Sequence, residues 1–328
     1  MKNKPILIVA GEPNSVFSEI FLKIISKKKF FSPIILIISL DLFKRQMKFL
    51  KFDIKLNLIN TNDLNKITLK NKNIYIINIK YDCLNIFDKI SDHSNLYIKK
   101  CFDVAFKILK NNITNKFING PVQKKYFLKK KYLGITEYIS KKFNIKNSAM
   151  LIFNKELGVC PITTHLPLKL VPKNINKKII EKKIMLLNDF YKKIIGFKPR
   201  LAITGLNPHC ESIDKFNEDE KIIKPAIKYL KKKNIDIKGP FSADTIFVKN
   251  NRANYDVIIG MYHDQVLTPI KTIYEYDAIN ITIGLPFLRV SPDHGPNENM
   301  IGLNSSNPLS LKRALEFLDN KWLKLKKV

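Results

Sequence analysis

The stretch Ile6-Leu-Ile-Val-Ala10, followed by Gly11-Glu12-Pro13, points to the fold class. Its five apolar residues imitate a signal peptide, but they are too few and run directly into a turn, so they predict a first buried strand. Two more short apolar runs with polar boundaries, Ile34 to Ile38 and Ile74 to Ile79, predict further strands. Segments with helical periodicity lie between and after these runs. This alternation predicts an α/β protein with a largely parallel sheet.

The same reasoning, applied outward along the chain, gives the remaining elements. Ser94 can cap a helix whose apolar face continues to Leu109. Further helices are expected at residues 15–27, 174–195, 217–232 and 309–325, and further strands at 117–119, 150–153, 159–163, 201–204, 255–259 and 279–283. The length of 328 residues exceeds that of one usual core, which favours one large domain or two intimately joined α/β subdomains. No internal repeat or Gly/Ser linker marks a boundary.

The charge balance at first suggests a nucleic-acid-binding protein. The net charge is +30, with 58 basic residues against 28 acidic ones. Only five of the basic residues are arginines, at Arg45, Arg200, Arg252, Arg289 and Arg313. Nucleic-acid surfaces usually use arginine forks, whereas lysine here is spread along the whole chain. We therefore interpret the charge as compositional drift and expect no specific nucleic-acid partner.

Cysteine usage and hydropathy indicate the compartment. The four cysteines (Cys83, Cys101, Cys160 and Cys210) lie far apart without a C-x-x-C pair, so neither a disulfide framework nor a cysteine zinc site is expected. The longest apolar stretch, Phe30 to Leu40, is interrupted by serine and proline and is shorter than the ~20 residues of a membrane helix. A cytoplasmic protein without a transmembrane segment is the expectation.

Histidines mark the first candidate site. The chain contains neither G-x-G-x-x-G nor a P-loop motif. Of its five histidines, His165, His209 and His263 each follow a predicted strand, in a turn rich in Thr, Pro, Asn or Asp. Ligand sites of α/β sheets assemble in such strand-end loops, and three neutral imidazoles can bind a divalent metal. Each histidine alone could equally be an ordinary loop residue, and the spacing of about fifty residues does not decide between these interpretations.

A second group of polar residues follows the third histidine. Lys271, Asn280 and Arg289 stand at two nine-residue intervals. In a chain so poor in arginine, Arg289 suggests a need for a planar fork that grips phosphate or carboxylate. Lys271 alone would be an ordinary solvated lysine, whereas Asn280 within an apolar strand needs partners. The polar segment from Ser291 to Gly302 is either a nucleotide-binding loop or a surface turn.

Taken together, these segments resemble the 4-hydroxythreonine-4-phosphate dehydrogenase family of pyridoxal phosphate biosynthesis. The resemblance rests on motifs in order along nearly the whole chain: Gly11-Glu12-Pro13, Asn119-Gly-Pro-Val122, Gly134-Ile-Thr-Glu137, Thr163-Thr-His-Leu-Pro167, Gly205-Leu-Asn-Pro-His209, Gly239-Pro240, Ala243-Asp-Thr245, Met261-Tyr-His-Asp-Gln265, Asn280 to Pro286 and Asp293-His-Gly295. It implies an isocitrate/isopropylmalate dehydrogenase-like fold of two α/β subdomains with largely parallel sheets flanking a cleft. The N- and C-terminal segments would share one subdomain, and the central segment would form the other.

The resemblance also implies the reaction and the residues that carry it. NAD or NADP would oxidise the C3 hydroxyl of 4-phosphooxy-L-threonine, and the product, 2-amino-3-oxo-4-phosphooxybutanoate, would lose CO2 to give 3-amino-2-oxopropyl phosphate. The implied metal ligands, for zinc, magnesium or cobalt shared across a homodimer, are His165, His209 and His263. The implied substrate-binding residues are Thr136, Lys271, Asn280 and Arg289. Lys271 leads as general base with Asp244 and Asp264 as alternatives, and the cofactor loop contributes His294, Gly295 and Asn299.

Several positions depart from the family pattern. Ile135 replaces the histidine of Gly-His-Thr-Glu, which contacts the substrate in the family, and isoleucine cannot donate a hydrogen bond. Cys210 and the residues after it replace a glycine-rich turn, Gln123 stands where histidine is common, and Asn299 takes an acidic position. The segment Asn14 to Ser18 lacks the family's glycine. A dehydrogenase for another phosphorylated hydroxy acid, or a weakly active or non-catalytic relative, therefore remains an alternative.

Overall fold

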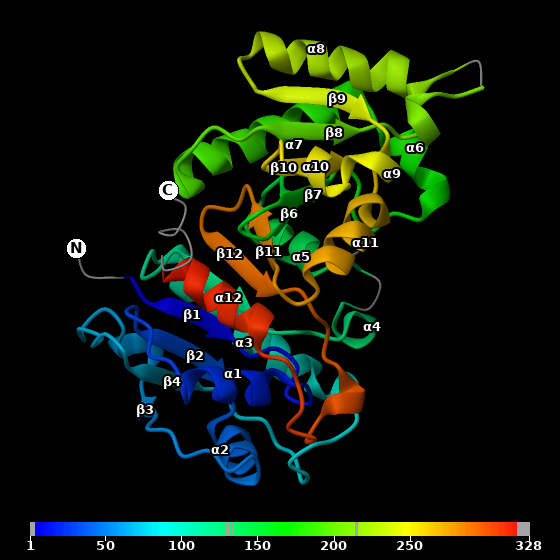
Figure 1. The fold of residues 1–328 in the computed structure, drawn as a ribbon. Coiled ribbons are helices and arrows are strands. Elements are labelled where there is room, and N and C mark those ends of the chain that lie inside the picture. Colours follow the sequence, from blue (N-terminus) through cyan, green and yellow to red (C-terminus); the bar gives the residue numbers. More distant parts are fainter. Residues whose placement is uncertain (1–3, 129–130, 133, 214–215, 320–328) are drawn as a thin grey trace. The chain divides into compact units, whose positions relative to one another are not determined.

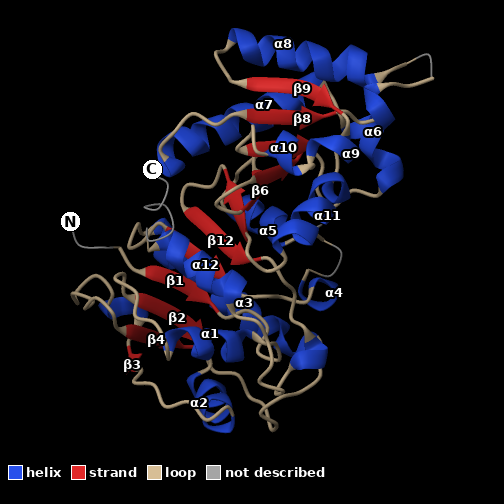
Figure 2. Ribbon diagram, in the orientation of Figure 1, coloured by secondary structure: helices blue, strands red, loops and turns tan. Residues whose placement is uncertain are grey.

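The computed structural model describes residues 4–128, 131–132, 134–213 and 216–319. The chain divides into two compact units: unit 1 comprises residues 1–138 and 286–328, and unit 2 comprises residues 139–285. Both units contain strands and helices in alternation (Figures 1 and 2), which confirms the predicted α/β class.

The described part of unit 1 is built on six strands in the order β3-β4-β2-β1-β5-β12, each parallel to its neighbours. Their bounds are β1 (Ile6–Val9), β2 (Ile34–Ile38), β3 (Asn57–Leu58), β4 (Ile74–Asn78), β5 (Lys116–Asn119) and β12 (Leu288–Pro292). All side chains of β1 and β2 are buried, as is typical of parallel strands covered on both faces.

Helices cover this sheet. They are α1 (Phe17–Ile25), α2 (Leu40–Phe49), α3 (Asn95–Lys110), α4 (Lys124–Phe127) and α12 (Leu309–Leu318), with α5 (Ile135–Lys142) at the boundary of the units. Helix α12 packs on β12 and α1, α2 packs on α1, and α3 packs on β1 and β2. The apolar face predicted for the segment after Ser94 is the buried face of α3.

Unit 2, within its described residues, also has six strands, in the order β11-β6-β7-β10-β8-β9. They are β6 (Ala149–Phe153), β7 (Gly158–Pro161), β8 (Leu201–Thr204), β9 (Ile237–Phe241), β10 (Val257–Gly260) and β11 (Ile279–Ile283). Strand β6 is antiparallel to β11 and β7, and the pairs from β7 to β9 are parallel. The largely parallel arrangement is therefore confirmed.

The helices of unit 2 complete its core. They are α6 (Val171–Asn174), α7 (Lys177–Phe190), α8 (Lys224–Lys232), α9 (Ala243–Ile246), α10 (Lys249–Arg252) and α11 (His263–Tyr274). Val266, Leu267 and Ile270 of α11 pack into a buried cluster with strand residues such as Val159 and Ile258. The predicted helix 174–195 corresponds to α7, which begins at Lys177, and to a π-helical segment at 191–195; of α6, only Asn174 lies within the predicted range.

Two predictions on helices need comment. The segment containing His263 was expected to be a turn, but α11 begins at that histidine; Pro269 inside the helix hid its periodicity. The predicted helix 309–325 ends at Leu318, and its last expected residues lie outside the described part of the chain. Within the described ranges, no helix is both long enough and apolar enough to cross a membrane.

Candidate active site

Three neighbouring strands of unit 2 present the predicted metal ligands at one edge of the sheet. Strands β7, β10 and β8 are parallel neighbours, so their carboxyl ends meet at the same edge. His165 follows β7, His263 follows β10 and His209 follows β8. The sequence could not show this adjacency, because the order of the strands in the sheet differs from their order in the chain.

Two of these histidines lie side by side. The ring centroids of His165 and His263 are 5.8 Å apart. Nδ1 of His263 lies 2.8 Å from a carboxylate oxygen of Asp264. This contact orients the ring, and Nε2 is then the ring nitrogen that faces away from Asp264. His209 is exposed on a turn with φ of 56°. Among the residues that the structure describes, no three His, Cys, Asp or Glu side chains converge closely enough to hold a metal.

Gln265 ties the histidine-bearing loops together, and the sequence analysis missed this role. Its Oε1 accepts hydrogen bonds from Thr204 Oγ1 at 2.8 Å and from the Met261 amide at 2.7 Å. Its Nε2 donates to the Gly205 carbonyl at 2.8 Å, and Thr163 Oγ1 donates to the Met261 carbonyl at 2.7 Å. The ends of β7, β8 and β10 are thereby joined. The position of Gln265 within the Tyr-His-Asp-Gln motif was the available signal.

The loop that carries His209 is shaped by a buried carboxylate. Asp219, fully buried, accepts hydrogen bonds from the amides of Leu206 and Asn207 at 2.8 and 3.2 Å. A Cβ at Gly205 would lie 2.5 Å from Asp219 Oδ1, which explains the glycine. Cys210 follows with φ of 62°, so the backbone adopts the left-handed conformation that glycine favours without having a glycine there.

The other predicted residues of unit 2 are spread over three elements. Asn280 lies in β11 opposite Ile152, and its Oδ1 is buried without a hydrogen-bond partner among the described residues. Lys271 and Asp264 stand seven residues apart on α11 and thus share one face of that helix. Asp244 is exposed in the first turn of α9. The three candidate bases therefore lie on two different helices, α9 and α11.

Arg289 is the centre of a separate polar cluster in unit 1. It lies on β12 opposite Phe117 of β5 and is 1% exposed. Its Nε donates to Asn119 Oδ1 at 2.8 Å, and its Nη1 donates to Thr136 Oγ1 at 3.1 Å. Burial lowers the pKa of Arg289 to about 10, and the Glu137 carboxylate opposes that shift. The guanidinium therefore stays charged at neutral pH. The structure brings together two of the predicted substrate-binding residues here.

Comparison with known proteins identifies the relationship. A family model described as the pyridoxal phosphate biosynthetic protein PdxA matches residues 29–318. The chain belongs to this family. A 4-hydroxythreonine-4-phosphate dehydrogenase from Sulfurihydrogenibium sp. is 36% identical over 316 residues, which cover 94% of this chain and 95% of that relative.

Other PdxA-like proteins extend the comparison. A D-threonate 4-phosphate dehydrogenase from Pectobacterium atrosepticum is 34% identical over 186 residues, 56% of this chain and 57% of that relative. The crystal structure of a 4-hydroxythreonine-4-phosphate dehydrogenase from Klebsiella pneumoniae matches with a TM-score of 0.82 at 24% identity, over 98% of each chain. An isocitrate dehydrogenase from Methylococcus capsulatus matches with a TM-score of 0.50 at 9% identity, over 97% of this chain and 86% of its own, which supports the expected dehydrogenase-like fold.

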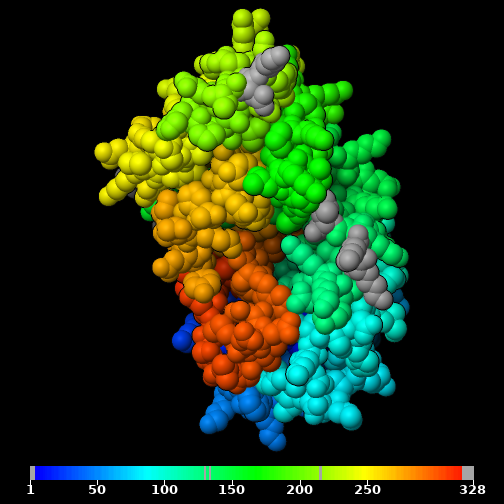
Figure 3. Space-filling model, turned by 90° about the vertical axis from the view of Figure 1, so that its right-hand side faces the viewer, coloured from blue at the N-terminus to red at the C-terminus, as the bar shows by residue number. Residues whose placement is uncertain are grey.

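In this PdxA-family chain the segment from Asp293 to Gly302 is a loop on the surface of unit 1. The Pro296 carbonyl accepts from the Val16 amide at 3.2 Å, and Glu298 Oε1 accepts from Gln123 Nε2 at 3.0 Å. A Cβ at Gly302 would lie 3.3 Å from the Phe87 ring. Figure 3 shows this part of the chain (orange) beside the residues around 90 (cyan). The predicted cofactor residues His294, Gly295 and Asn299 are all on this loop.

A buried carboxyl group lies in the same unit. Glu12, directly after β1, is 2% exposed. Its Oε2 accepts from Ser94 Oγ at 2.9 Å and its Oε1 from the Asn14 amide at 3.4 Å. Burial raises the pKa of Glu12 to about 7, and the nearby Glu298 carboxylate adds to the increase. The sequence analysis used Glu12 as part of a motif without assigning it this property.

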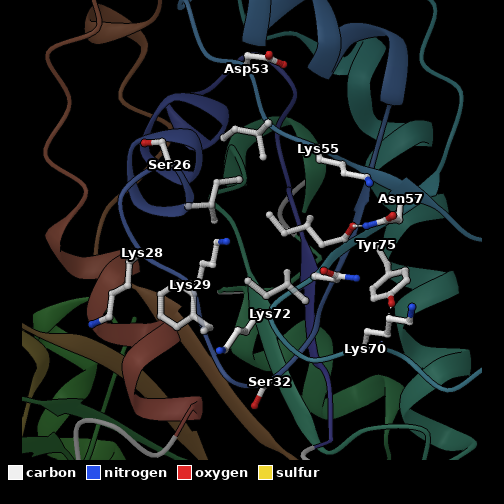
Figure 4. A pocket seen from close by; sticks show the side chains of 16 residues that line it. Ser26, Lys28, Lys29, Ser32, Asp53, Lys55, Asn57, Lys70, Lys72 and Tyr75 are labelled. Carbon is white, nitrogen blue, oxygen red and sulfur yellow. Dashed lines mark hydrogen bonds between the residues drawn. The ribbon is translucent and has the colours of Figure 1, made fainter.

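One cavity of unit 1 is lined by none of these residues. It has a volume of about 670 Å³ and is lined by residues that precede or begin β2, β3 and β4. Figure 4 shows five lysines on its walls: Lys28, Lys29, Lys55, Lys70 and Lys72. None of the predicted site residues lines it. Lysines on a cavity wall are what the composition of this chain supplies, so the cavity is not assigned to the reaction.

Proposed function

We propose that this chain is an NAD(P)-dependent 4-hydroxythreonine-4-phosphate dehydrogenase. It would oxidise 4-phosphooxy-L-threonine to 2-amino-3-oxo-4-phosphooxybutanoate, which loses CO2 to form 3-amino-2-oxopropyl phosphate. The observation that carries the proposal is the relative with this activity in its name that is 36% identical across nearly the full length of both chains. The retained histidines, Lys271, Asn280 and Arg289 argue against a non-catalytic relative.

The histidines of unit 2 fit a divalent metal in part. His165 and His263 are adjacent, and Asp264 orients the second ring. A homodimer with shared ligands, which the family resemblance implies, would complete the set that includes His209. When bound, zinc, magnesium or cobalt supplies a Lewis acid that lowers the pKa of an alcohol. We propose these three histidines as the metal ligands.

The chain's own residues would bind the substrate and move the proton. Arg289 and Thr136 would bind an anionic group, because an anion that accepts charge-assisted hydrogen bonds from a buried guanidinium stabilises its charge. Asn280, whose buried Oδ1 has no partner among the described residues, would accept a hydrogen bond from the substrate. A bound nicotinamide would supply the acceptor for the C3 hydride, and Lys271 would take the hydroxyl proton. Asp244 and Asp264 are the alternative bases.

The cofactor and the cell compartment complete the proposal. The loop with His294, Gly295 and Asn299 would bind NAD or NADP, and the protein would act in the cytoplasm as a homodimer. A second candidate function is the oxidation of another phosphorylated hydroxy acid. The D-threonate 4-phosphate dehydrogenase, 34% identical over about half of each chain, favours this alternative, as does Ile135 at a substrate position.

One assay tests both candidates. Purified full-length protein with NAD or NADP and added Zn²⁺, Mg²⁺ or Co²⁺ is given either 4-phosphooxy-L-threonine or D-threonate 4-phosphate, and reduced cofactor is measured. We expect turnover of the first substrate, its loss on chelation, and its loss in His263→Ala. The matched control His93→Ala, in unit 1 beside Tyr81, should keep full activity. Preference for the second substrate would establish the alternative, and turnover of neither would reject both.

A further inference from the structure

The side chain of Asn119 is held in one orientation at the end of β5. It is 3% exposed. Its Oδ1 accepts from Arg289 Nε at 2.8 Å, and its Nδ2 donates to the Gly120 carbonyl at 3.0 Å. A flipped amide would set its NH2 group against the Arg289 N–H and its oxygen against a carbonyl, so both contacts would become repulsive. The amide is therefore locked by its two neighbours.

This locked amide fixes the guanidinium of Arg289. Hydrogen bonds at Nε and Nη1 act at two points of one planar group, so together they set its plane and the directions of its other N–H bonds. Arg289 is opposite Phe117 in the register, and Asn119 lies two residues closer to the carboxyl end of β5. The guanidinium is thus drawn along the strands towards the edge at which α/β proteins bind ligands.

The anchoring on the other side of Asn119 is backbone. The Gly120 amide donates to the Val9 carbonyl at 2.7 Å, and a Cβ at Gly120 would lie 2.0 Å from the Ala10 carbonyl oxygen. The backbone at Gly120, whose carbonyl accepts the hydrogen bond from Asn119, is therefore packed tightly against the end of β1. This rigid support allows Asn119 to transmit a fixed geometry to Arg289.

We propose that Asn119 is a positioning residue that orients Arg289 for the anionic group of the substrate. The inference rests on the proposed function, because it takes Arg289 as a substrate-binding residue. Asn119 itself need not touch the substrate. It acts through one hydrogen bond to a cation, and loss of such a bond typically costs ~1.5 to 3 kcal/mol, about ten- to a hundred-fold in binding.

The test is a double-mutant cycle in the full-length protein. Asn119→Leu keeps the side-chain volume but removes the acceptor, and Asn119→Thr restores an oxygen acceptor on a residue that suits a strand. We expect KM for the phosphorylated substrate to rise about ten-fold or more in Asn119→Leu, with kcat changed far less. Asn119→Thr should recover part of the affinity. Lysine has no Nε–H group to donate to Asn119. In an Arg289→Lys background, Asn119→Leu should therefore raise KM little further.

A merely structural role predicts a different pattern. Across the variants, the increase in KM would then scale with the decrease in the thermal unfolding midpoint. The effects of the two substitutions on KM would also be additive in free energy. Either result would overturn the proposal. Asn188→Leu in α7 is the matched control, because Asn188 is also a buried asparagine but lies in unit 2. It should leave KM unchanged.

Failure of the proposed function is distinguishable. Unchanged KM in Arg289→Lys alone would remove Arg289 from substrate binding, and with it the role of Asn119. If the wild type turns over neither phosphorylated substrate, the same cycle is measured as the binding constant for inorganic phosphate. Coupling between the two residues in that constant supports positioning, and additivity rejects it.

Discussion

At the scale of single residues, unit 1 buries the ionisable side chains of Arg289 on β12 and of Glu12 directly after β1. Arg289 keeps its charge beside the Asn119 amide, the Thr136 hydroxyl and the Glu137 carboxylate, whereas burial raises the pKa of Glu12 to about 7. The rarity of arginine in this chain made Arg289 a candidate anion-binding residue at the level of the sequence. It did not identify Gln265, Asp219 or Asn119, because their importance comes from hydrogen bonds to distant backbone and side-chain groups.

Ile135 is the residue at which this chain should differ most from its relatives. It is half-buried at the first position of α5, next to Thr136. Ile135→His should raise kcat/KM for 4-phosphooxy-L-threonine about ten- to a hundred-fold, because a charge-assisted hydrogen bond contributes ~1.5 to 3 kcal/mol. Steady-state kinetics check this. A decrease would mean that the pocket has adapted to isoleucine and would favour the second candidate function.

Glu12 should make the stability of the protein depend on pH. Its pKa is raised from 4.5 to about 7, so the folded state holds a proton that the unfolded state releases. The contribution of this bound proton to the free energy of unfolding is fully present below pH 4.5 and is lost as the pH rises to about 7. Over this range the free energy of unfolding falls by an amount on the order of 3 kcal/mol.

Glu12→Gln removes this titration. The difference in free energy of unfolding between the variant and the wild type should therefore grow in favour of the variant from pH 4.5 to 7 and then level off. Denaturant titrations at several pH values measure it. A constant difference across that range would show that Glu12 titrates normally in the folded protein.

At the scale of elements, strands of continuous apolar or β-branched residues were predictable, and strands interrupted by polar residues, glycine or proline were not. Residues 34–38, 201–204 and 279–283 were predicted with the bounds that the structure has, because these strands are almost wholly apolar or β-branched. Strands β3 and β9 were missed; both are at the end of their unit's strand order, where polar residues, glycine and proline are tolerated. Strand β12 was missed because Arg289 and Pro292 interrupt its apolar pattern.

The short turn at Pro208–Cys210 should be strained. Cys210 adopts a φ of 62°, and the left-handed conformation costs a non-glycine residue roughly 1 to 2 kcal/mol. Cys210→Gly should therefore raise the free energy of unfolding by about 1 kcal/mol, measured by denaturant titration. The matched substitution Cys83→Gly, at a half-buried cysteine without positive φ, should lower it. Destabilisation of both variants to the same extent would argue against strain at Cys210.

At the scale of the whole molecule, the charge of +30 should produce only non-specific binding to nucleic acid. Counterion release predicts weak binding at low salt that falls steeply between about 50 and 200 mM salt. Duplexes of unrelated sequence should bind equally well in a filter-binding or fluorescence assay. A preferred sequence that still binds at physiological salt would contradict our interpretation of the lysines as compositional drift.

The order of the two units along the chain has a consequence for synthesis on the ribosome. Unit 2 is one continuous stretch, whereas unit 1 needs residues from both sides of it. Strand β12 pairs with β5, which is made about 170 residues earlier in the chain, as the register Leu288↔Lys116 shows. During translation, therefore, unit 2 can fold before unit 1 is complete. One edge of β5 stays unpaired until β12 has been made. Until β12 is made, that unpaired edge is open to pairing with a strand of another chain, which is a route to aggregation of the nascent protein.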